Sequence, residues 1–218
     1  MQIAINKIHF PVTALGRGRR VGIWTQGCSI RCRGCVSVDT WEPDPAKLIE
    51  VDDLLRGIEP WISEADGVTI SGGEPFDQPD GLRAMVEALR RRETGDILVY
   101  SGYSHGHLSG RFDDILDCVD VLISEPFVAG ASDRLTLRGS DNQRCWLLTD
   151  RARRLYSKTL DQEVWPASRR MDVVIDDESA VWMAGIPRRG EMETLLARLA
   201  TMGYECATSR DSRPVIRA

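Results

Sequence analysis

The sequence predicts an α/β fold with a largely parallel sheet, followed by a small α+β appendage. Over the first two thirds of the chain, short apolar runs typical of buried strands alternate with segments of helical periodicity. The chemically distinctive residues come directly after predicted strands, where the loops of parallel α/β folds converge. Beyond Arg144 this alternation ends.

The predicted elements follow in a regular order. Residues 2–10 alternate apolar and polar side chains as in a half-buried strand, and residues 21–24 read as a short buried strand. A Pro/Asp loop at 42–48 precedes an amphipathic helix over 51–62. The other elements of this part are a strand at 67–70, a helix around 82–89, a strand at 97–100, a short helix at 115–116 and a strand at 119–123.

The C-terminal part has a different pattern. Residues 171–175 and 181–186 are typical of two strands, and residues 191–202 of an amphipathic helix. That helix has an apolar stripe of Leu195, Leu196 and Leu199 that needs burial. We therefore expect a core over residues 1–144 and an extension over 145–218 that acts as a cover or a docking element, the stripe favouring a cover.

Composition excludes several classes of protein. The 218 residues are 42% hydrophobic and 28% charged, as in an ordinary globular protein. A net charge of -5 argues against general attraction to nucleic acid. No apolar stretch approaches the roughly 20 residues that span a bilayer, and the N-terminus lacks the pattern of a secretory signal. We expect a cytoplasmic protein without a membrane or nucleic-acid partner.

Three of the six cysteines lie close together, in the pattern C-x3-C-x2-C formed by Cys28, Cys32 and Cys35. Such thiols can converge on one centre, and thiolates suit zinc or iron-sulfur clusters. Structural zinc normally takes four ligands, and no second cysteine pair follows. Three cysteines on a 4Fe-4S cluster leave one iron open, where a substrate or cofactor could bind. The isolated cysteines are expected to be small buried side chains: Cys118, Cys145 and Cys206.

A second motif, Gly72-Gly73-Glu74-Pro75, follows the next strand along the chain after the cysteines. Together the two motifs resemble those of the radical S-adenosylmethionine (SAM) superfamily. The resemblance implies an incomplete (β/α) barrel, a 4Fe-4S cluster on the three cysteines, and a Gly-Gly-Glu-Pro element that holds the amino end of SAM. Glycines let a ligand reach the backbone, and a carboxylate balances an ammonium group.

Within that superfamily, residues 1–144 are most similar to the small activating enzymes of anaerobic ribonucleotide reductase. The matching strings are Trp24-Thr25-Gln26-Gly27-Cys28, Arg33-Gly34-Cys35, Thr40-Trp41, Tyr100-Ser101-Gly102-Tyr103, Val121-Leu122-Ile123 with Pro126-Phe127, and residues 138–144. The likeness implies SAM contacts from Tyr100, Ser101, Gly102, Ser124 and Glu125. It also gives Trp41 a role in shielding the cluster.

Two positions depart from that group. Val36-Ser37 stands where the group has His-Asn, and Ser124-Glu125 stands where Asp-Gly is expected. The contacts to the ribose and carboxylate of SAM can therefore differ from those of the group.

The resemblance implies reductive cleavage of SAM to a 5′-deoxyadenosyl radical, which takes a hydrogen atom from a substrate. In an activating enzyme the hydrogen comes from a glycine of a partner protein, a glycyl radical enzyme, and a flavodoxin or ferredoxin supplies the electron. One alternative is a radical SAM enzyme acting on a small molecule or a peptide. Another is a ferredoxin-like carrier or a zinc-binding module, which has no use for Gly-Gly-Glu-Pro.

Overall fold

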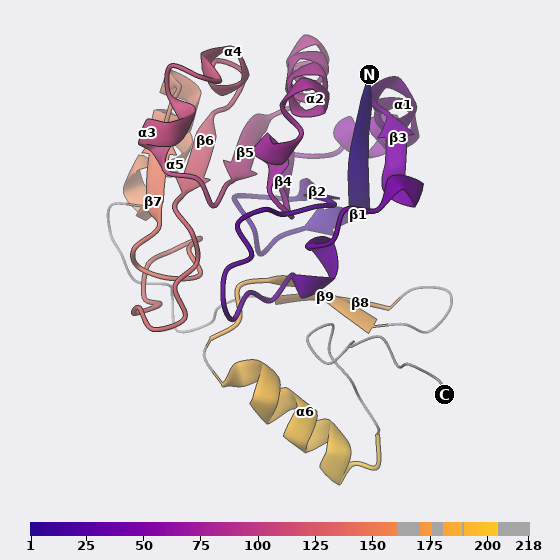
Figure 1. Ribbon diagram of the computed structural model, residues 1–218, viewed down its shortest axis with the longest axis vertical. Helices are drawn as coiled ribbons and strands as arrows, with labels where there is room; N and C mark the ends of the chain where they lie inside the picture. The colour runs from indigo at the N-terminus through magenta and orange to yellow at the C-terminus, as the bar shows by residue number, and fades with distance from the viewer. Residues whose placement is uncertain (161–170, 176–180, 189, 205–218) are drawn as a thin grey trace.

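The computed structural model describes residues 1–160, 171–175, 181–188 and 190–204. Its centre is a seven-stranded sheet (Figure 1). In spatial order the strands are β3 (Leu48–Glu50), β1 (Gln2–Val12), β2 (Arg20–Thr25), β4 (Gly67–Gly72), β5 (Asp96–Tyr100), β6 (Val121–Ser124) and β7 (Arg144–Leu147). The central strands β2, β4, β5 and β6 are parallel, which confirms a mixed α/β fold.

The outer strands are antiparallel to their neighbours, a feature that the sequence analysis did not predict. Only residues 13–19 join β1 to β2. A parallel connection needs a crossover of about a dozen residues or more, so this short link imposes an antiparallel pair. The predicted loop at 42–48 was partly wrong, because it contains the short helix η2 (Pro45–Lys47) and the first residue of β3.

Helices α1 (Val51–Ile62) and α2 (Pro79–Arg91) cover one face of the sheet. Their apolar positions, among them Leu54, Leu55, Leu82 and Met85, are buried with the strand side chains of that face. The helical periodicity of the sequence therefore predicted the main core. The other helices of this part are short: η1 (Val38–Thr40), η3 (Pro75–Asp77), α3 (His105–Leu108) and α4 (Asp113–Leu116).

Helix α5 (Asp150–Leu160) packs on the opposite face through Ala152 and Tyr156. The Tyr156 hydroxyl donates to the Asp96 carboxylate at 2.8 Å. That carboxylate forms a buried ion pair with Arg20 at 2.9 Å. This charged group lies at the amino ends of β2 and β5, at the edge opposite the predicted site. The expected boundary at residue 144 falls within β7, a strand of the main sheet.

Beyond α5, an antiparallel hairpin of β8 (Met171–Ile175) and β9 (Val181–Gly185) packs on the same face of the sheet as α5. Trp182 makes an edge contact with Trp24 of β2, with ring centroids 5.6 Å apart. The Asp172 carboxylate accepts the backbone N–H groups of Thr13 and Ala14 at 2.7 and 3.0 Å. The two predicted strands are confirmed, and these contacts fix them to the β1–β2 pair.

Helix α6 (Glu191–Thr201) is confirmed, but its expected burial is wrong. It lies at the bottom of Figure 1, away from the main sheet, and none of its residues is buried. Leu195, Leu196 and Leu199 are only half-buried. The hairpin lies between α6 and the sheet, so the hairpin and not the helix covers the sheet. Within the described ranges, none of the helices has the length and apolar character needed to span a bilayer.

Candidate functional site

The three predicted cysteines lie in a segment that we call the cysteine loop, residues 27–41, directly after β2. The backbone N–H of Gly27 donates to the Thr40 carbonyl at 2.7 Å, and that of Cys28 donates to the Trp41 carbonyl at 2.9 Å. These two bonds close the base of the loop. The loop therefore projects from the carboxyl end of β2, where the sequence analysis placed it.

Each of the three thiols is partly exposed and accepts backbone hydrogen bonds. Cys28 accepts from two N–H groups of its own loop, and Cys32 accepts from the N–H of Phe127. The N–H of Ser37 lies 3.4 Å from Cys35 Sγ. Hydrogen bonds of this kind favour the thiolate, which is the form that binds a metal.

Burial raises the pKa of the Cys28 and Cys32 thiols, and the nearby Glu74 carboxylate adds to the increase. The backbone N–H groups lower the pKa of both thiols in part. A metal centre of positive charge removes the proton of a coordinating thiol outright. The site is therefore suited to thiolates once such a centre is bound.

The described residues contain no group of three His, Cys, Asp or Glu side chains placed to hold one metal ion. Convergence of the three thiols on one larger centre stays a prediction, because this result concerns only side chains that meet at the position of a single ion. Tetrahedral zinc requires ligands that meet at one such position. In a 4Fe-4S cluster each cysteine binds a different iron atom, so the thiols can stand further apart. The three soft sulfur donors suit a 4Fe-4S cluster.

The two glycines of Gly-Gly-Glu-Pro are required by packing of the protein against itself. Gly72 has a φ of 102°, and a Cβ there would lie 2.5 Å from the backbone nitrogen of Thr25. A Cβ on Gly73 would lie 2.1 Å from the Gly27 carbonyl oxygen. The same oxygen accepts the Glu74 N–H at 2.9 Å. The end of β4 thus packs backbone to backbone on the start of the cysteine loop.

The Glu74 carboxylate is buried and joins the loops that follow β4 and β5. One oxygen accepts from Ser101 Oγ at 2.8 Å and from the Phe76 N–H at 3.1 Å. The other oxygen accepts from the Gly102 N–H at 2.7 Å. Burial raises the pKa of Glu74 to about 7, although all three donors favour ionisation. The buried Pro75 begins η3. An additional bond from Glu74 to the amino group of SAM stays a prediction.

Tyr100 ends β5, Ser101 and Gly102 follow it, and the three predicted residues have different surroundings. Ser101 and Gly102 contact Glu74, and a Cβ on Gly102 would lie 3.0 Å from the Ile30 side chain of the cysteine loop. Tyr100 instead belongs to the apolar cluster under the hairpin, and its hydroxyl donates to the Leu137 carbonyl at 3.0 Å. Ser101 and Gly102 therefore lie beside the cysteine loop, whereas Tyr100 packs on the face of the sheet that the hairpin covers.

Ser124 ends β6, and Glu125 follows it at the same edge of the sheet. Ser124 is fully buried, and its Oγ accepts from Trp146 Nε1 at 2.9 Å. Glu125 has a φ of 81°, and its N–H donates to the Tyr103 carbonyl. A left-handed backbone favours glycine, which explains why glycine is expected at this position. Contacts of both side chains with SAM stay predictions.

The aromatic residues around the loop have defined places. The Trp41 carbonyl accepts the Cys28 N–H. The Trp41 side chain is half-buried, and its role as a shield for the cluster stays a prediction. His105 stacks on Trp146 with centroids 4.0 Å apart, and His107 stacks on Tyr103 at 4.6 Å. Both histidines lie in the short helix α3 and pack on aromatic rings of neighbouring segments.

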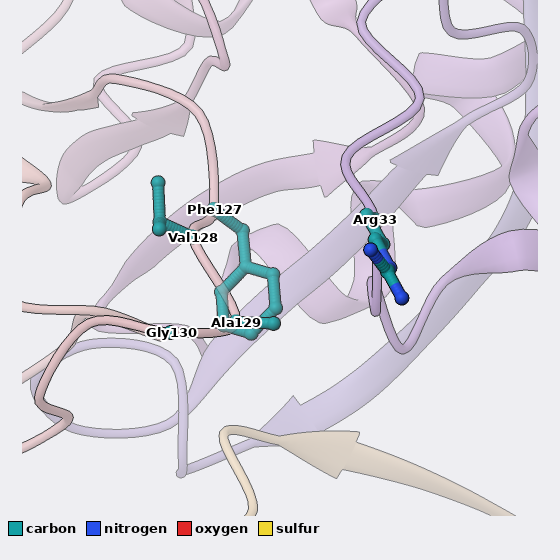
Figure 2. A pocket seen from close by; sticks show the side chains of 5 residues that line it. All are labelled: Arg33, Phe127, Val128, Ala129 and Gly130. Carbon is teal, nitrogen blue, oxygen red and sulfur yellow. The ribbon is translucent and has the colours of Figure 1, made fainter.

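A cavity of about 490 Å³ lies beside the second half of the cysteine loop. Figure 2 shows Arg33 on one side and residues 127–130 on the other. Gly34 has a φ of 84°, and a Cβ there would lie 3.2 Å from Ala129 Cβ. The sequence analysis did not select residues 127–130 as site residues. The matched string Pro126-Phe127 could have drawn attention to this loop.

Three polar residues at the site were also missed as functional candidates: Ser29, Asp77 and Tyr103. They are hydrogen-bonded to one another between the cysteine loop and the loops after β4 and β5. Asp77 comes three residues after Glu74, and Tyr103 ends a matched string. Their positions in the sequence were therefore a signal that could have been used.

The fold and the site define an iron-sulfur enzyme that uses SAM, with a three-cysteine loop and Gly-Gly-Glu-Pro at one edge of a parallel sheet. More specifically, the chain belongs to the family of 4Fe-4S single cluster domains, whose model matches residues 14–146. This finding confirms the resemblance to radical SAM proteins. The cofactors are a 4Fe-4S cluster and SAM.

Similar curated proteins include anaerobic ribonucleoside-triphosphate reductase-activating proteins. The one from Vibrio cholerae is 28% identical over 144 residues, which are 62% of this chain and 92% of the relative. The one from Enterobacteria phage T4 is 30% identical over 62% of this chain and 88% of its own length. A pyruvate formate-lyase-activating enzyme of Clostridium pasteurianum is 29% identical over 50% of this chain and 45% of its own.

Proposed function

We propose that this protein activates a glycyl radical enzyme, with an anaerobic ribonucleotide reductase as the first candidate. The main support is that two reductase-activating proteins match over 92% and 88% of their own lengths. The family match includes the cysteine loop and Gly-Gly-Glu-Pro. In this proposal Cys28, Cys32 and Cys35 hold the cluster and leave one iron open for SAM.

When bound and reduced, the cluster supplies the electron that splits SAM into methionine and a 5′-deoxyadenosyl radical, which takes a hydrogen atom from a glycine Cα. The backbone donors around the cysteines stabilise their thiolates. Glu74, once ionised, balances the ammonium group of SAM and holds Ser101 and Gly102 in place. Trp41 keeps water from the cluster.

The direct test is electron paramagnetic resonance (EPR) on a mixture of this protein, SAM, a strong one-electron reductant and the anaerobic reductase of the same cell. We expect a glycine-centred doublet that depends on SAM. The triple variant Cys28→Ser, Cys32→Ser, Cys35→Ser is the control and should give none. Absence of a doublet with every glycyl radical protein of that cell would contradict the proposal.

A radical SAM enzyme that acts on a small molecule or a peptide is the second candidate. It is favoured by the extension, because the reductase-activating relatives match only 62% of this chain. The change to Ser124-Glu125 also alters the edge that faces SAM. Transfer of deuterium from a labelled small molecule or peptide into 5′-deoxyadenosine, without a glycine doublet, would favour this candidate.

We further propose that the sheet is an incomplete (β/α) barrel and that the extension covers its open face. The support is the hairpin, which packs on the face opposite α1 and α2. Ala184 is buried there with Val12 and Leu15, and the half-buried Trp182 and Ile186 pack around them. A cover at this position restricts the approach of a substrate to the edge that carries the cysteine loop.

The electron donor in this proposal is a flavodoxin or a ferredoxin, and the enzyme works in the cytoplasm. The cysteine loop presents Arg31 and Arg33 to solvent, and Arg31 pairs with Glu42 at 2.9 Å. Reduction of the cluster by purified flavodoxin or ferredoxin, followed by EPR, tests the donor. Failure of both proteins where dithionite succeeds would exclude them.

A further inference from the structure

The first half of the cysteine loop is held from outside by one carboxylate. Asp77 Oδ2 accepts the backbone N–H of Ser29, the residue after Cys28, at 2.7 Å. Asp77 Oδ1 accepts from Ser29 Oγ at 2.9 Å. Two bonds to adjacent atoms of one residue fix both its position and its orientation. Since Cys28 itself is bound to the Trp41 carbonyl, the backbone around this thiol is held on both sides.

The Tyr103 hydroxyl completes the arrangement. It lies 2.8 Å from Asp77 Oδ1 and 3.0 Å from Ser29 Oγ, so the three side chains form a closed triangle. Two hydroxyl protons serve these three contacts, so at any moment two of the three are hydrogen bonds, and the Asp77 carboxylate accepts at least one of them. The triangle joins the loops that follow β2, β4 and β5.

Tyr103 is itself well anchored. Its N–H donates to Ser101 Oγ at 3.1 Å, and its carbonyl accepts the Glu125 N–H at 3.0 Å. Its ring stacks on His107 with an interplanar angle of 14°. The triangle therefore connects Cys28 to the loops after β5 and β6, which are expected to contact SAM.

We propose that Asp77 is a positioning residue for the cluster: together with Ser29 and Tyr103, a group we call the loop latch, it sets the position of Cys28 relative to the SAM-binding loops. The proposal rests on the cluster site of the proposed function but not on any particular hydrogen-atom donor. Ser29 and Asp77 are exposed and Tyr103 is partly exposed, so the latch acts on the loop more than on global stability.

The test compares Asp77→Ala with Asp80→Ala, a matched control. Asp80 is also an exposed aspartate, three residues along the chain, and it pairs with Arg83 outside the latch. In metal-free protein, Asp77→Ala should accelerate alkylation of Cys28 by iodoacetamide about three- to tenfold, the effect expected for loss of modest hydrogen bonds. Asp80→Ala should leave the rate unchanged. Peptide mass spectrometry separates Cys28 from the other thiols.

The same variants are then loaded with the cluster. Asp77→Ala should release iron to a chelator several times faster than the wild type does. With SAM added, the EPR spectrum of its reduced cluster should differ from the wild-type spectrum under the same conditions. Ser29→Ala and Tyr103→Phe keep the charge of Asp77 and should show smaller changes in the same direction. These two variants also serve if Asp77→Ala does not fold.

Asp77→Asn separates position from charge, because asparagine keeps one oxygen acceptor and loses the charge. If the latch acts by position, the alkylation and iron-release rates of this variant lie between those of wild type and Asp77→Ala. Equal behaviour of Asp77→Asn and Asp77→Ala would show that only charge matters and would overturn the proposal. Rates for Asp77→Ala equal to those for Asp80→Ala would overturn it as well. Both readouts are independent of any glycyl radical protein.

Discussion

Single residues of the cysteine loop differ in surroundings from the other described cysteines. Cys28, Cys32 and Cys35 accept backbone N–H groups at the sheet edge, whereas Cys118 and Cys145 pack against the apolar clusters of the sheet. We therefore expect that serine at any one of the first three positions abolishes the cluster, because a 4Fe-4S centre with two protein ligands is not retained. Iron and sulfide analysis after anaerobic reconstitution measures the effect.

The controls for this prediction are Cys118→Ser, Cys145→Ser and Cys206→Ser, each of which should keep full iron and sulfide content. Cys206 lies outside the described residues. Stoichiometric zinc without iron in anaerobically prepared protein would contradict the cluster assignment.

Glu74 is expected to make the folded state less stable as the pH rises from about 4.5 to about 7. Burial raises its pKa from 4.5 to about 7, so the folded protein holds this proton more tightly than the unfolded chain does. The stabilising effect of protonation is full below pH 4.5 and is lost as the pH rises through 7. Glu74→Gln cannot ionise and should remove this part of the pH dependence.

Urea denaturation of metal-free protein across this pH range tests the prediction. Glu64→Gln is the control, because Glu64 is exposed, and it should keep the wild-type slope. An identical slope for Glu74→Gln and wild type would show that Glu74 does not titrate in this range.

At the residue scale, motif and spacing predicted the cysteines and Gly-Gly-Glu-Pro because these residues are consecutive along the chain. They could not predict that Gly73 faces the Gly27 carbonyl, since that contact depends on how two loops pack. The closed triangle of Asp77, Ser29 and Tyr103 could not be predicted for the same reason, although Asp77 and Tyr103 stand close to the matched motifs. Its members are 48 and 26 residues apart in sequence, and no local pattern relates them.

Helix α5 is attached to the sheet by the Tyr156 hydroxyl, which bonds to the buried ion pair of Arg20 and Asp96. Besides its bond to Asp96, Tyr156 Oη lies 3.2 Å from Arg20 Nη1. Tyr156→Phe should lower the free energy of unfolding by about 2 kcal/mol, since hydrogen bonds to charged groups are worth roughly 1.5–3 kcal/mol. Denaturant unfolding measures this change. Tyr204→Phe, at an exposed position, should have no effect. Equal stability of Tyr156→Phe and wild type would mean that only the ring holds α5.

At the element scale, periodicity predicted α1, α2 and α6 because each has an apolar face. It could not predict whether that face is covered. The stripe of α6 is only half-buried although its pattern resembles that of α1, since burial depends on a partner surface elsewhere in the chain. Strand direction was likewise predictable only where a helical crossover of sufficient length joined two strands.

For the molecule as a whole, Trp182 should decide whether the extension stays on the sheet. Its ring contacts Trp24 and His9, and Lys7 Nζ lies 4.7 Å from its centre. Trp182→Ala should weaken the attachment of the hairpin by about 1–2 kcal/mol and should accelerate proteolysis beyond residue 160. Val181→Ala, at an exposed position of the same strand, is the control. Equal proteolysis rates in the two variants would show that Trp182 does not hold the hairpin.

The buried pair of Arg20 and Asp96 lies at the amino ends of the strands, and the cysteine loop projects from their carboxyl ends. Arg20 also donates to the Val68 carbonyl, so its side chain links the three strands β2, β4 and β5 at one edge of the sheet. Replacement of a loop at the opposite edge leaves these Arg20 contacts intact. The protein should therefore tolerate grafts of segment 128–131 from related enzymes, which leave Glu74, the loop latch and the Phe127 N–H unchanged and open the cavity beside Arg33 to directed evolution.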